Sequence, residues 1–242
     1  KIALENVITS IGSCAFQNCT SLKQFNSETD GVFNVPTSVK SISSYAFYNC
    51  ALAETITLSD EVTSIGSYAF AGCSLVSRFN SDSVTELIVP ASCATIGEYA
   101  FKGMALITNV VVPDSVETIG NAAFNDFNSL ESITLPFVGE SENADYYEAV
   151  FGYVFGYTYV EKGSYKVHAP SKEFVNTSYT SSDGVWQYTC EASYNNKILT
   201  SGNGVYDAVF FYYIPMSLRE VIVTRQTSLP VAAFNGCSML EK

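Results

Sequence analysis

The segment IGSYAFAGCSL, from Ile65 to Leu75, decides the fold because the chain repeats it with small changes along its length. Each copy places an Ala-Phe pair a few residues after an aliphatic residue and ends in a small or apolar residue. The other copies are IGSCAFQNC from Ile11, ISSYAFYNC from Ile42, IGEYAFKGM from Ile96, IGNAAFNDF from Ile119 and the more divergent LPVAAFNGC from Leu229.

The spacing of the copies defines the structural unit. Among the first five copies the paired phenylalanines are 31, 23, 31 and 23 residues apart, so every second one is 54 residues apart. The chain is therefore built from a unit of 23 residues that is lengthened by eight in alternate copies. A period of about 20 to 29 residues is typical of leucine-rich repeats. The six phenylalanines are Phe16, Phe47, Phe70, Phe101, Phe124 and Phe234.

The residues around each Ala-Phe pair predict how one unit folds. Short runs such as FNVP, LIVP, VVVP and ITLP indicate strands, because apolar and β-branched residues are bounded by turn formers. Each coil is expected to hold one strand near ITL, a second near VTSI, and the Ala-Phe turn. A single coil cannot bury its own apolar face, so the coils must stack, with the phenylalanines in one buried column.

Further apolar positions recur in register with the pair. One lies three residues before each leading isoleucine, at Ile8, Val39, Val62, Cys93 and Val116. Another lies six residues after the phenylalanine, at Leu22, Val76, Ile107, Leu130 and Leu240. The second copy departs from this pattern, with Leu52 one place early.

These units resemble the BspA-like leucine-rich repeats of bacterial and protozoan surface proteins, whose pattern is roughly I-x-I-P-x-x-V-x-x-I-G-x-x-A-F-x-x-C-x-x-L. The best-matching stretch is VPDSVETIGNAAFNDFNSLESITLP, from Val112 to Pro136. PFVG at Pro136–Gly139 and FGYVFG at Phe151–Gly156 resemble an insertion of gut-bacterial members. The chain departs from the pattern where Met104 and Phe127 replace the cysteine, and its insertion is long.

The resemblance implies a right-handed, β-rich leucine-rich-repeat solenoid with short helical turns. We expect repeats over residues 1–138, an aromatic-rich β insertion over 139–214 and a resumed repeat over 215–242. The chain begins and stops within the repeat pattern, so we expect a fragment of a longer protein. The resemblance also implies adhesion or contact with host matrix at a cell surface.

Composition narrows the classes of partner. The 242 residues are 47% hydrophobic and 15% charged, which suits a well-buried chain, and the net charge is −12. An acidic surface repels phosphate backbones and anionic lipid, so a nucleic acid is not an expected partner. No apolar run approaches the roughly 20 residues that a transmembrane helix requires.

The seven cysteines and the single histidine do not predict chemistry. Cys19, Cys50, Cys73 and Cys237 each follow a repeat phenylalanine by three residues, and Cys93 occupies a valine position, so these five are predicted core fillers. The other two, Cys14 and Cys190, stay open, since extracellular chains usually pair their cysteines. Without CxxC spacing no metal site is expected.

Catalysis is not predicted either. His168 with Cys190 is the one Cys–His combination outside the repeats, and it lacks a recognisable flanking signature. Paired acids such as Glu140 with Glu142 are interpreted as solvated loop charges. We therefore expect no enzyme and no cofactor.

The insertion concentrates the aromatic residues. It holds twelve of the 16 tyrosines and the single tryptophan, Trp186. FGYVFGYTYV and DAVFFYYIP are predicted strands, and SGNGV at Ser201–Val205 is a predicted hairpin turn. The aromatic rings either pack on one another and on the solenoid or form a ligand platform. In the second case Tyr179, Trp186 and Tyr188 are the candidate ligand-binding residues, where the insertion meets the last repeats.

Two hypotheses for function follow. The leading one is a non-enzymatic surface module that binds a host or extracellular-matrix protein through its long stacked face. The alternative is a carbohydrate-binding module in which aromatic rings of the insertion stack on sugars. The fold alone does not choose between them.

Overall fold

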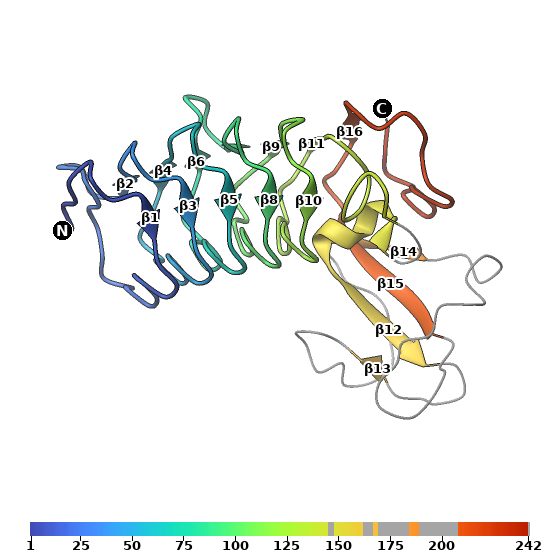
Figure 1. Ribbon diagram of the computed structural model, residues 1–242. Helices are drawn as coiled ribbons and strands as arrows, with labels where there is room; N and C mark the ends of the chain where they lie inside the picture. The colour runs from blue at the N-terminus through green and yellow to red at the C-terminus, as the bar shows by residue number, and fades with distance from the viewer. Residues whose placement is uncertain (145–147, 162–166, 169–183, 189–207, 242) are drawn as a thin grey trace.

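A computed structural model describes residues 1–144, 148–161, 167–168, 184–188 and 208–241. The repeats form a solenoid of stacked coils, and a small antiparallel sheet projects from the end where the last repeats lie (Figure 1). The β-rich repeat solenoid that the sequence predicts is thereby confirmed. In the described ranges no helix is long and apolar enough to cross a membrane.

One side of the solenoid is a five-stranded parallel sheet. Each strand has two residues, of which the first is a serine or threonine that points outward and the second is a buried isoleucine. The isoleucines pair in register from Ile11 to Ile42 and onward along the sheet. The strands are β1 (Ser10–Ile11), β3 (Ser41–Ile42), β5 (Ser64–Ile65), β8 (Thr95–Ile96) and β10 (Thr118–Ile119).

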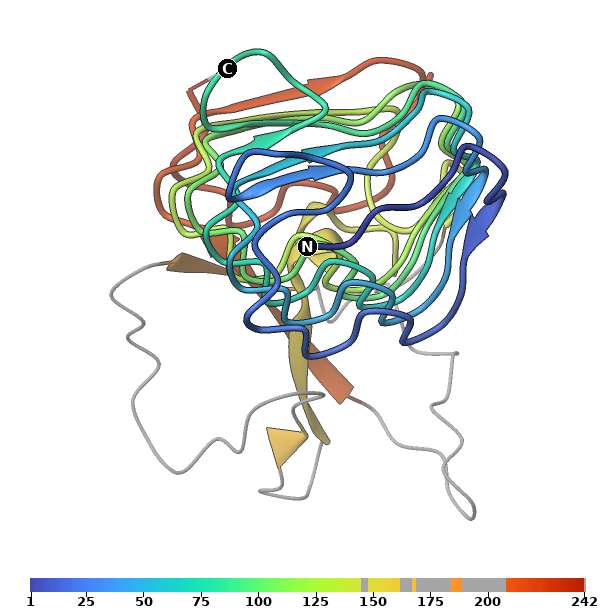
Figure 2. The same cartoon turned by 90° about the vertical axis from the view of Figure 1, so that its left-hand side faces the viewer.

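A seven-stranded parallel sheet occupies another side of the coil, as the view along the solenoid shows (Figure 2). Its strands alternate buried and partly exposed residues, as expected for a sheet with one face on the core. In chain order the strands are β2 (Val32–Asn34), β4 (Thr55–Thr57), β6 (Arg78–Phe79), β7 (Glu86–Ile88), β9 (Asn109–Val111), β11 (Ser132–Leu135) and β16 (Glu220–Val223).

The eight residues that lengthen alternate units add an extra rung to this second sheet. In the longer unit Phe79 of β6 is the register partner of Leu87 in β7, eight residues later. An isolated bridge joins Phe25 to Phe33 in the same way. Both added phenylalanines, Phe25 and Phe79, are fully buried and meet the main phenylalanine column edge-on.

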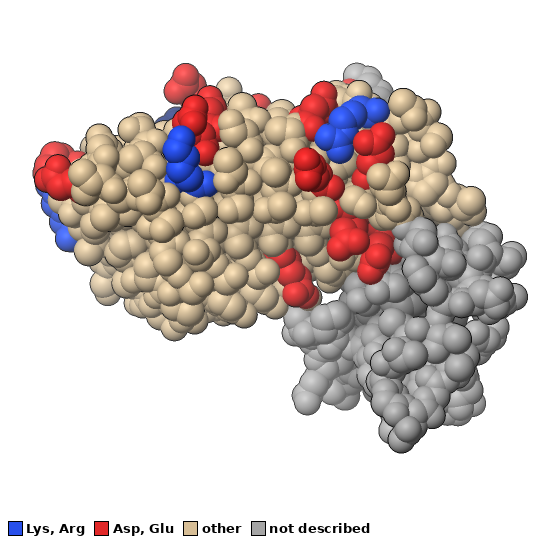
Figure 3. Space-filling view, in the orientation of Figure 1, with Lys and Arg blue, Asp and Glu red and all other residues tan. Residues whose placement is uncertain are grey.

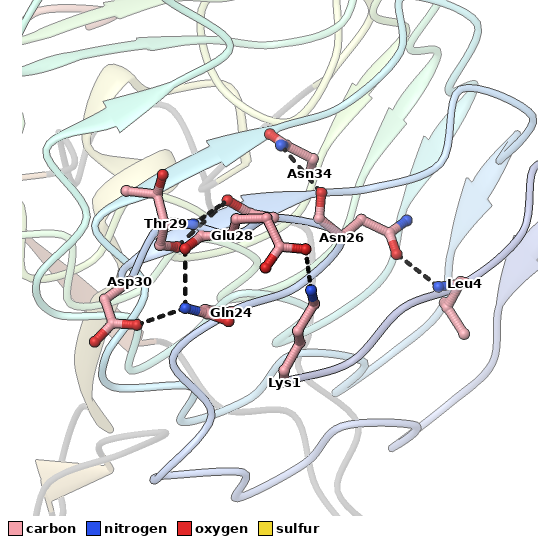
Figure 4. Close-up of polar contacts among 9 residues, drawn as sticks. Lys1, Leu4, Gln24, Asn26, Glu28, Thr29, Asp30 and Asn34 are labelled. Atoms are coloured by element: carbon pink, nitrogen blue, oxygen red, sulfur yellow. Dashed lines mark hydrogen bonds and ion pairs between the residues drawn. The ribbon is translucent and has the colours of Figure 1, made fainter.

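An asparagine holds each of these added loops. Asn26 and Asn80 lie 54 residues apart, and both have a left-handed backbone, with φ of 47° and 52°. The Asn26 side chain accepts a hydrogen bond from the Leu4 amide at 2.6 Å, and Asn80 accepts one from Leu58 at 2.5 Å. Around the first loop Gln24 donates to the Glu28 carbonyl and to Asp30, and Lys1 pairs with Glu28 (Figure 4).

The Ala-Phe segment is a turn with two left-handed residues, which explains its composition. The second of them follows the phenylalanine by two positions and is always Asn, Asp or Gly, the residues that tolerate positive φ best. The first precedes the phenylalanine by two positions. Its residues are Cys14, Tyr45, Tyr68, Tyr99, Ala122 and Ala232.

The phenylalanines stack in one column, as predicted. Neighbouring ring centroids from Phe16 to Phe124 lie 5.3, 5.4, 6.1 and 5.7 Å apart. Phe47, Phe70, Phe101 and Phe124 are buried, whereas Phe16 is half-buried in the first coil. Backbone amides of each turn donate to carbonyls of the next, for example from Phe47 to Ala69 at 2.8 Å. The column and this ladder join the coils.

The second copy keeps the register that its sequence seemed to break. Ala53, not Leu52, occupies the buried position there, and its amide donates to the Cys50 carbonyl as Val76 does to Cys73. Leu52 is only half-buried. A small residue, Ala53, therefore fills the slot that larger apolar residues occupy in the other copies.

The predicted insertion contains a four-stranded antiparallel sheet with the order β13-β12-β15-β14. The prediction of one strand over FGYVFGYTYV is half wrong, because Phe151–Phe155 form a 3-10 helix, η2, and the strand begins at Tyr157. SGNGV lies outside the described residues. The strands are β12 (Tyr157–Glu161), β13 (Val167–His168), β14 (Gly184–Tyr188) and β15 (Ala208–Pro215).

The 3-10 helix η2 takes the place of a repeat turn within the stack. On one side the amides of Ala122 and Phe124 donate to carbonyls of Tyr153 and Val154, and on the other the Phe151 amide donates to Ala233. Strand β16 then pairs with β11 in full register. The solenoid therefore continues through residues that lie within the predicted 139–214 insertion.

Candidate functional site

The predicted ligand-binding residues lie in the insertion, of which the structure describes only part. Tyr179 lies outside the described residues, as does Cys190. Trp186 and Tyr188 belong to β14, an edge strand that pairs only with β15 in the described sheet, and their register partners are Tyr213 and Phe211. Their part in binding stays a prediction.

The outer face of the five-stranded sheet forms an open groove of about 560 Å³. Its lining consists of small hydroxyl residues, glycines and the backbone around the buried isoleucines, and contains no charged side chain. The surface over β3, β5 and β8 is correspondingly tan, with charges at its margins (Figure 3). The hydroxyl residues of the groove are Ser13, Ser41, Ser43, Ser44, Ser64, Ser67, Thr95 and Thr118.

These eight hydroxyls have no hydrogen-bond partner among the described residues. Within the described residues none of them forms a hydrogen bond, whereas hydroxyls elsewhere, such as Ser38, Ser115 and Ser217, bond to carbonyls of neighbouring coils. A hydroxyl both donates and accepts, so the groove offers two kinds of bond at each position.

Glycines allow the coils beneath this groove to pack closely. A Cβ on Gly66, Gly97 or Gly120 would lie 2.5, 2.3 or 2.4 Å from a backbone nitrogen of the preceding coil. Any side chain there would push the coils apart. The glycines therefore bring the hydroxyl-bearing residues of successive coils as near as a parallel sheet allows.

A ladder of tyrosines begins where the groove lining ends. Tyr45, Tyr68 and Tyr99 stack with centroids 4.8 and 4.9 Å apart, and Tyr48 lies tilted against Tyr45 at 5.5 Å. Tyr45, Tyr68 and Tyr99 occupy the first left-handed position of their turns, whereas Tyr48 directly follows Phe47. Tyr45 and Tyr68 directly follow the groove residues Ser44 and Ser67. We call these four residues the tyrosine ladder.

Tyr45, Tyr48 and Tyr68 are half-buried, whereas the last member of the ladder is buried. Tyr99 is buried, and Lys102 lies 5.2 Å from its ring centre while pairing with Asp126 at 3.6 Å. Burial, with smaller effects of Tyr99 and Glu98, raises the pKa of Tyr68 to about 12, so its hydroxyl stays protonated. Tyr45 is half-buried, and the coil before it supplies Cys14 at this position, a side chain too small to cover a phenol ring.

The sequence reasoning missed this ladder, although the signal was present. The tyrosine that precedes Ala-Phe recurs in three successive copies, as Tyr45, Tyr68 and Tyr99. Repeated tyrosines at one position of a stacked coil place their rings one rung apart, about 4.8 Å. That recurrence alone predicts a ladder.

The outer face of the seven-stranded sheet carries a different set of side chains. One row in register contains charged and amide groups, with Arg78 beside Glu86, and Asn109 donating to Glu86 at 2.6 Å. Within the described residues Arg78 forms no ion pair. The neighbouring row contains Ile88, Val111, Thr134 and Ile222, of which Ile222 is 44% exposed.

The repeat cysteines are free thiols that fill space. Cys50, Cys73 and Cys93 are buried as predicted, while Cys19 and Cys237 pack against the core and stay half-buried. Burial raises the pKa of Cys50 to about 12 and that of Cys93 to about 11, and it raises that of Cys73 further. Such thiols ionise poorly and are weak nucleophiles.

The structure does not test the predicted absence of a metal site or the predicted absence of catalysis. Among the described residues no group of three or more His, Cys, Asp or Glu side chains could hold a metal ion. His168 lies on β13, at the edge of its sheet opposite β14. The pairing of His168 with Cys190 therefore stays untested.

Known proteins resemble this chain mainly in its repeats. A family model described as "BspA type Leucine rich repeat region" matches six copies over residues 1–81 and 76–153. No curated protein matches the chain significantly.

Solved structures of bacterial repeat proteins also match. A leucine-rich repeat protein from Bacteroides ovatus is 26% identical over 56% of this chain, with a TM-score of 0.43. One from T. pallidum is 28% identical over 43%, with a TM-score of 0.36. A leucine rich cell surface protein from Faecalibacterium prausnitzii is 23% identical over 55%, with a TM-score of 0.32. The matches span 39%, 58% and 46% of those three chains.

Proposed function

The chain belongs to the BspA-type leucine-rich-repeat family, and we propose that it is a non-enzymatic module that binds an extracellular or host protein at a cell surface. Repeat stacks of this kind present long continuous faces to partners. The family's repeat fold is generally non-enzymatic. The partner and the location belong to the proposal alone.

The outer face of the seven-stranded sheet is the observation that carries this proposal. It combines an arginine without an ion pair among the described residues, carboxylates at Glu86 and Glu220, and a neighbouring aliphatic row. Interfaces between proteins join apolar contacts with hydrogen-bonding and charged groups, and arginine is enriched among residues that dominate binding energy. We therefore assign the protein contact to this face.

The test uses the intact chain and extracellular-matrix proteins immobilised one at a time on a biosensor. At least one of them should bind saturably, and Arg78→Ala should weaken that binding at least tenfold, about 1.4 kcal/mol. Ile88→Asp should act similarly by placing a charge in the aliphatic row. Ser74→Gln, an exposed residue on a turn of the same solenoid, is the matched control and should bind as the parent does.

Two results would oppose this assignment. If both variants bound the captured protein as tightly as the parent, the contact would lie elsewhere. If Trp186→Ala, Tyr188→Ala or Tyr179→Ala abolished binding while Arg78→Ala did not, the insertion would carry the contact, as the sequence predicted.

Location can be tested separately from binding. If the module lies outside the cell, protease added to intact cells should remove it, and an antibody against the repeats should label unpermeabilised cells. Protection from the protease until the cells are lysed would refute the surface location and leave the binding assay unaffected.

A further inference from the structure

We propose that the groove of the five-stranded sheet is a second binding site, which takes an uncharged glycan chain lying along the solenoid axis. The ligand would span the outer faces of β3, β5 and β8, with a sugar ring against Tyr45. This site is distinct from the protein contact assigned to the seven-stranded sheet, and it does not involve the insertion.

The unused hydroxyls define the ligand's chemistry. Eight serine and threonine hydroxyls line one groove, and none has a partner among the described residues. Sugars present hydroxyls that also donate and accept, so the two surfaces match group for group. Because no charged side chain lines the groove, the site offers nothing to neutralise a uronate, sulfate or phosphate.

The geometry fits an extended chain. Rungs of a parallel sheet repeat every ~4.8 Å, so the four steps from the coil of Ser13 to that of Thr118 extend over roughly 19 Å. The groove volume of about 560 Å³ lies within the ~300–1,000 Å³ that is usual for small-ligand sites. A short oligosaccharide fits that length and volume.

Tyr45 does not line the groove itself, but it directly follows the lining residue Ser44 and so offers an aromatic ring at the groove's margin. One face of its ring stacks on Tyr68, and the equivalent residue of the preceding coil is the smaller Cys14, which is exposed. The ring of Tyr48 is tilted by 59° against that of Tyr45, so this end of the tyrosine ladder carries two aromatic rings. The C–H face of a sugar ring packs well on such a surface, which is apolar on its face and polar at its hydroxyl.

A peptide fits the groove less well. Peptides bind sheets by adding a strand at an open edge, but β3, β5 and β8 are paired on both sides. Peptide side chains otherwise need apolar pockets, and the isoleucines of these strands are at most 2% exposed. The face therefore lacks both features that a peptide would use.

The experiment is titration calorimetry of the intact chain with neutral hexasaccharides built from glucose, xylose, mannose or galactose, and with an oligogalacturonate of the same length. At least one neutral chain should bind with a dissociation constant of about 1 mM or tighter, and the galacturonate should bind at least tenfold more weakly. Ser74→Gln should bind as the parent does.

Two kinds of variant test the placement. Ser41→Gln with Ser64→Gln fills the groove, and Ser64→Ala with Thr95→Ala removes hydroxyls without adding volume, so the second pair keeps the test valid if the first unfolds. Tyr45→Ala removes the ring. Each variant should weaken binding at least tenfold, with circular dichroism unchanged.

Three outcomes would overturn the proposal. No neutral oligosaccharide binds at millimolar concentration; or folded groove variants bind as tightly as the parent; or Trp186→Ala removes the binding and Tyr45→Ala does not. Loss of glycan binding in groove variants that still capture the protein partner would separate this site from the one on the seven-stranded sheet.

Discussion

Replacing Gly97 by alanine should force two coils of the solenoid apart. A Cβ at this position would lie 2.3 Å from the Ser67 nitrogen, 2.5 Å from the Gly66 carbonyl carbon and 2.7 Å from the Ser67 Cα, whereas ordinary contacts begin at 3.4 Å. All three atoms belong to backbone. The Gly97 amide also donates to the Ile65 carbonyl at 2.8 Å, so relief by movement strains the ladder between the coils.

The cost can be worked from that overlap. A shift of about 1 Å between rigid backbone segments belongs at the upper end of overpacking penalties, about 3 kcal/mol. For a chain of this size each kcal/mol lowers the melting temperature by about 2–4 °C, so Gly97→Ala should melt about 6–12 °C below the parent. Gly12 is the matched control, since a Cβ there meets nothing within 4 Å. Gly12→Ala should be neutral or more stable by about 0.4–1 kcal/mol.

The assay is thermal unfolding followed by circular dichroism at 218 nm, a wavelength chosen for its β signal, with urea unfolding as a check on the free energy. The comparison of the two alanine variants cancels the general effect of Gly→Ala on the unfolded chain. If Gly97→Ala and Gly12→Ala melted within about 2 °C of one another, a difference below about 1 kcal/mol, close coil contact at the groove would be refuted.

Three other perturbations probe different parts of the molecule. Phe70→Ala should cost about 3–5 kcal/mol in unfolding experiments, because the ring is fully buried in the column, and Phe16→Ala, in a half-buried position, should cost clearly less; equal losses would contradict the column. A thiol reagent should label exposed Cys14 rapidly and Cys50, Cys73 and Cys93 only after denaturation, since burial raises their pKa values; fast native labelling of Cys73 would show that it is accessible. Burial, and then the neighbouring Glu148, raise the pKa of Glu140. Above that raised pKa the charged carboxylate destabilises the folded state. As the pH falls through the raised pKa, the carboxylate is protonated and the stability is regained. Glu140→Gln should therefore melt higher than the parent at pH 7.5, with the difference shrinking toward pH 4.5; a constant difference would contradict the assignment.

The stacked core was predictable from the sequence because its positions recur with a fixed period. Phe47, Phe70, Phe101 and Phe124 stand in equivalent positions of similar local sequences, so equivalent backbone turns place them in one column. The two strands per coil followed from β-branched residues beside turn formers. The thiols were predictable as fillers because Met104 and Phe127 occupy the same slot and are equally buried.

Other features depend on contacts that no single copy shows. The sequence shows that alternate units are eight residues longer, but the pairing of Phe79 with Leu87, which makes an added strand of them, appears only in the structure. The apolar residues of the 3-10 helix η2 predict a strand. Hydrogen bonds with Ala122, Phe124 and Ala233 in the neighbouring coils hold these residues in a turn instead. The groove and tyrosine ladder went unrecognised because exposure of Tyr45 and the serines is set by the coil next to them.

The pairing of β16 with β11 has a consequence for the order in which the molecule assembles. Register partners in these strands are 88 residues apart, against 23 for the shorter steps of the solenoid. The longer loop is about two doublings longer than a 23-residue step. Closing it therefore costs roughly 1.2 kcal/mol more in conformational entropy. As the chain emerges from the ribosome, the first five coils can already be in place while the residues between these strands are still being made. The final coil is then the slow closing step of folding, and in hydrogen exchange the amides of β16 should open before those of β5.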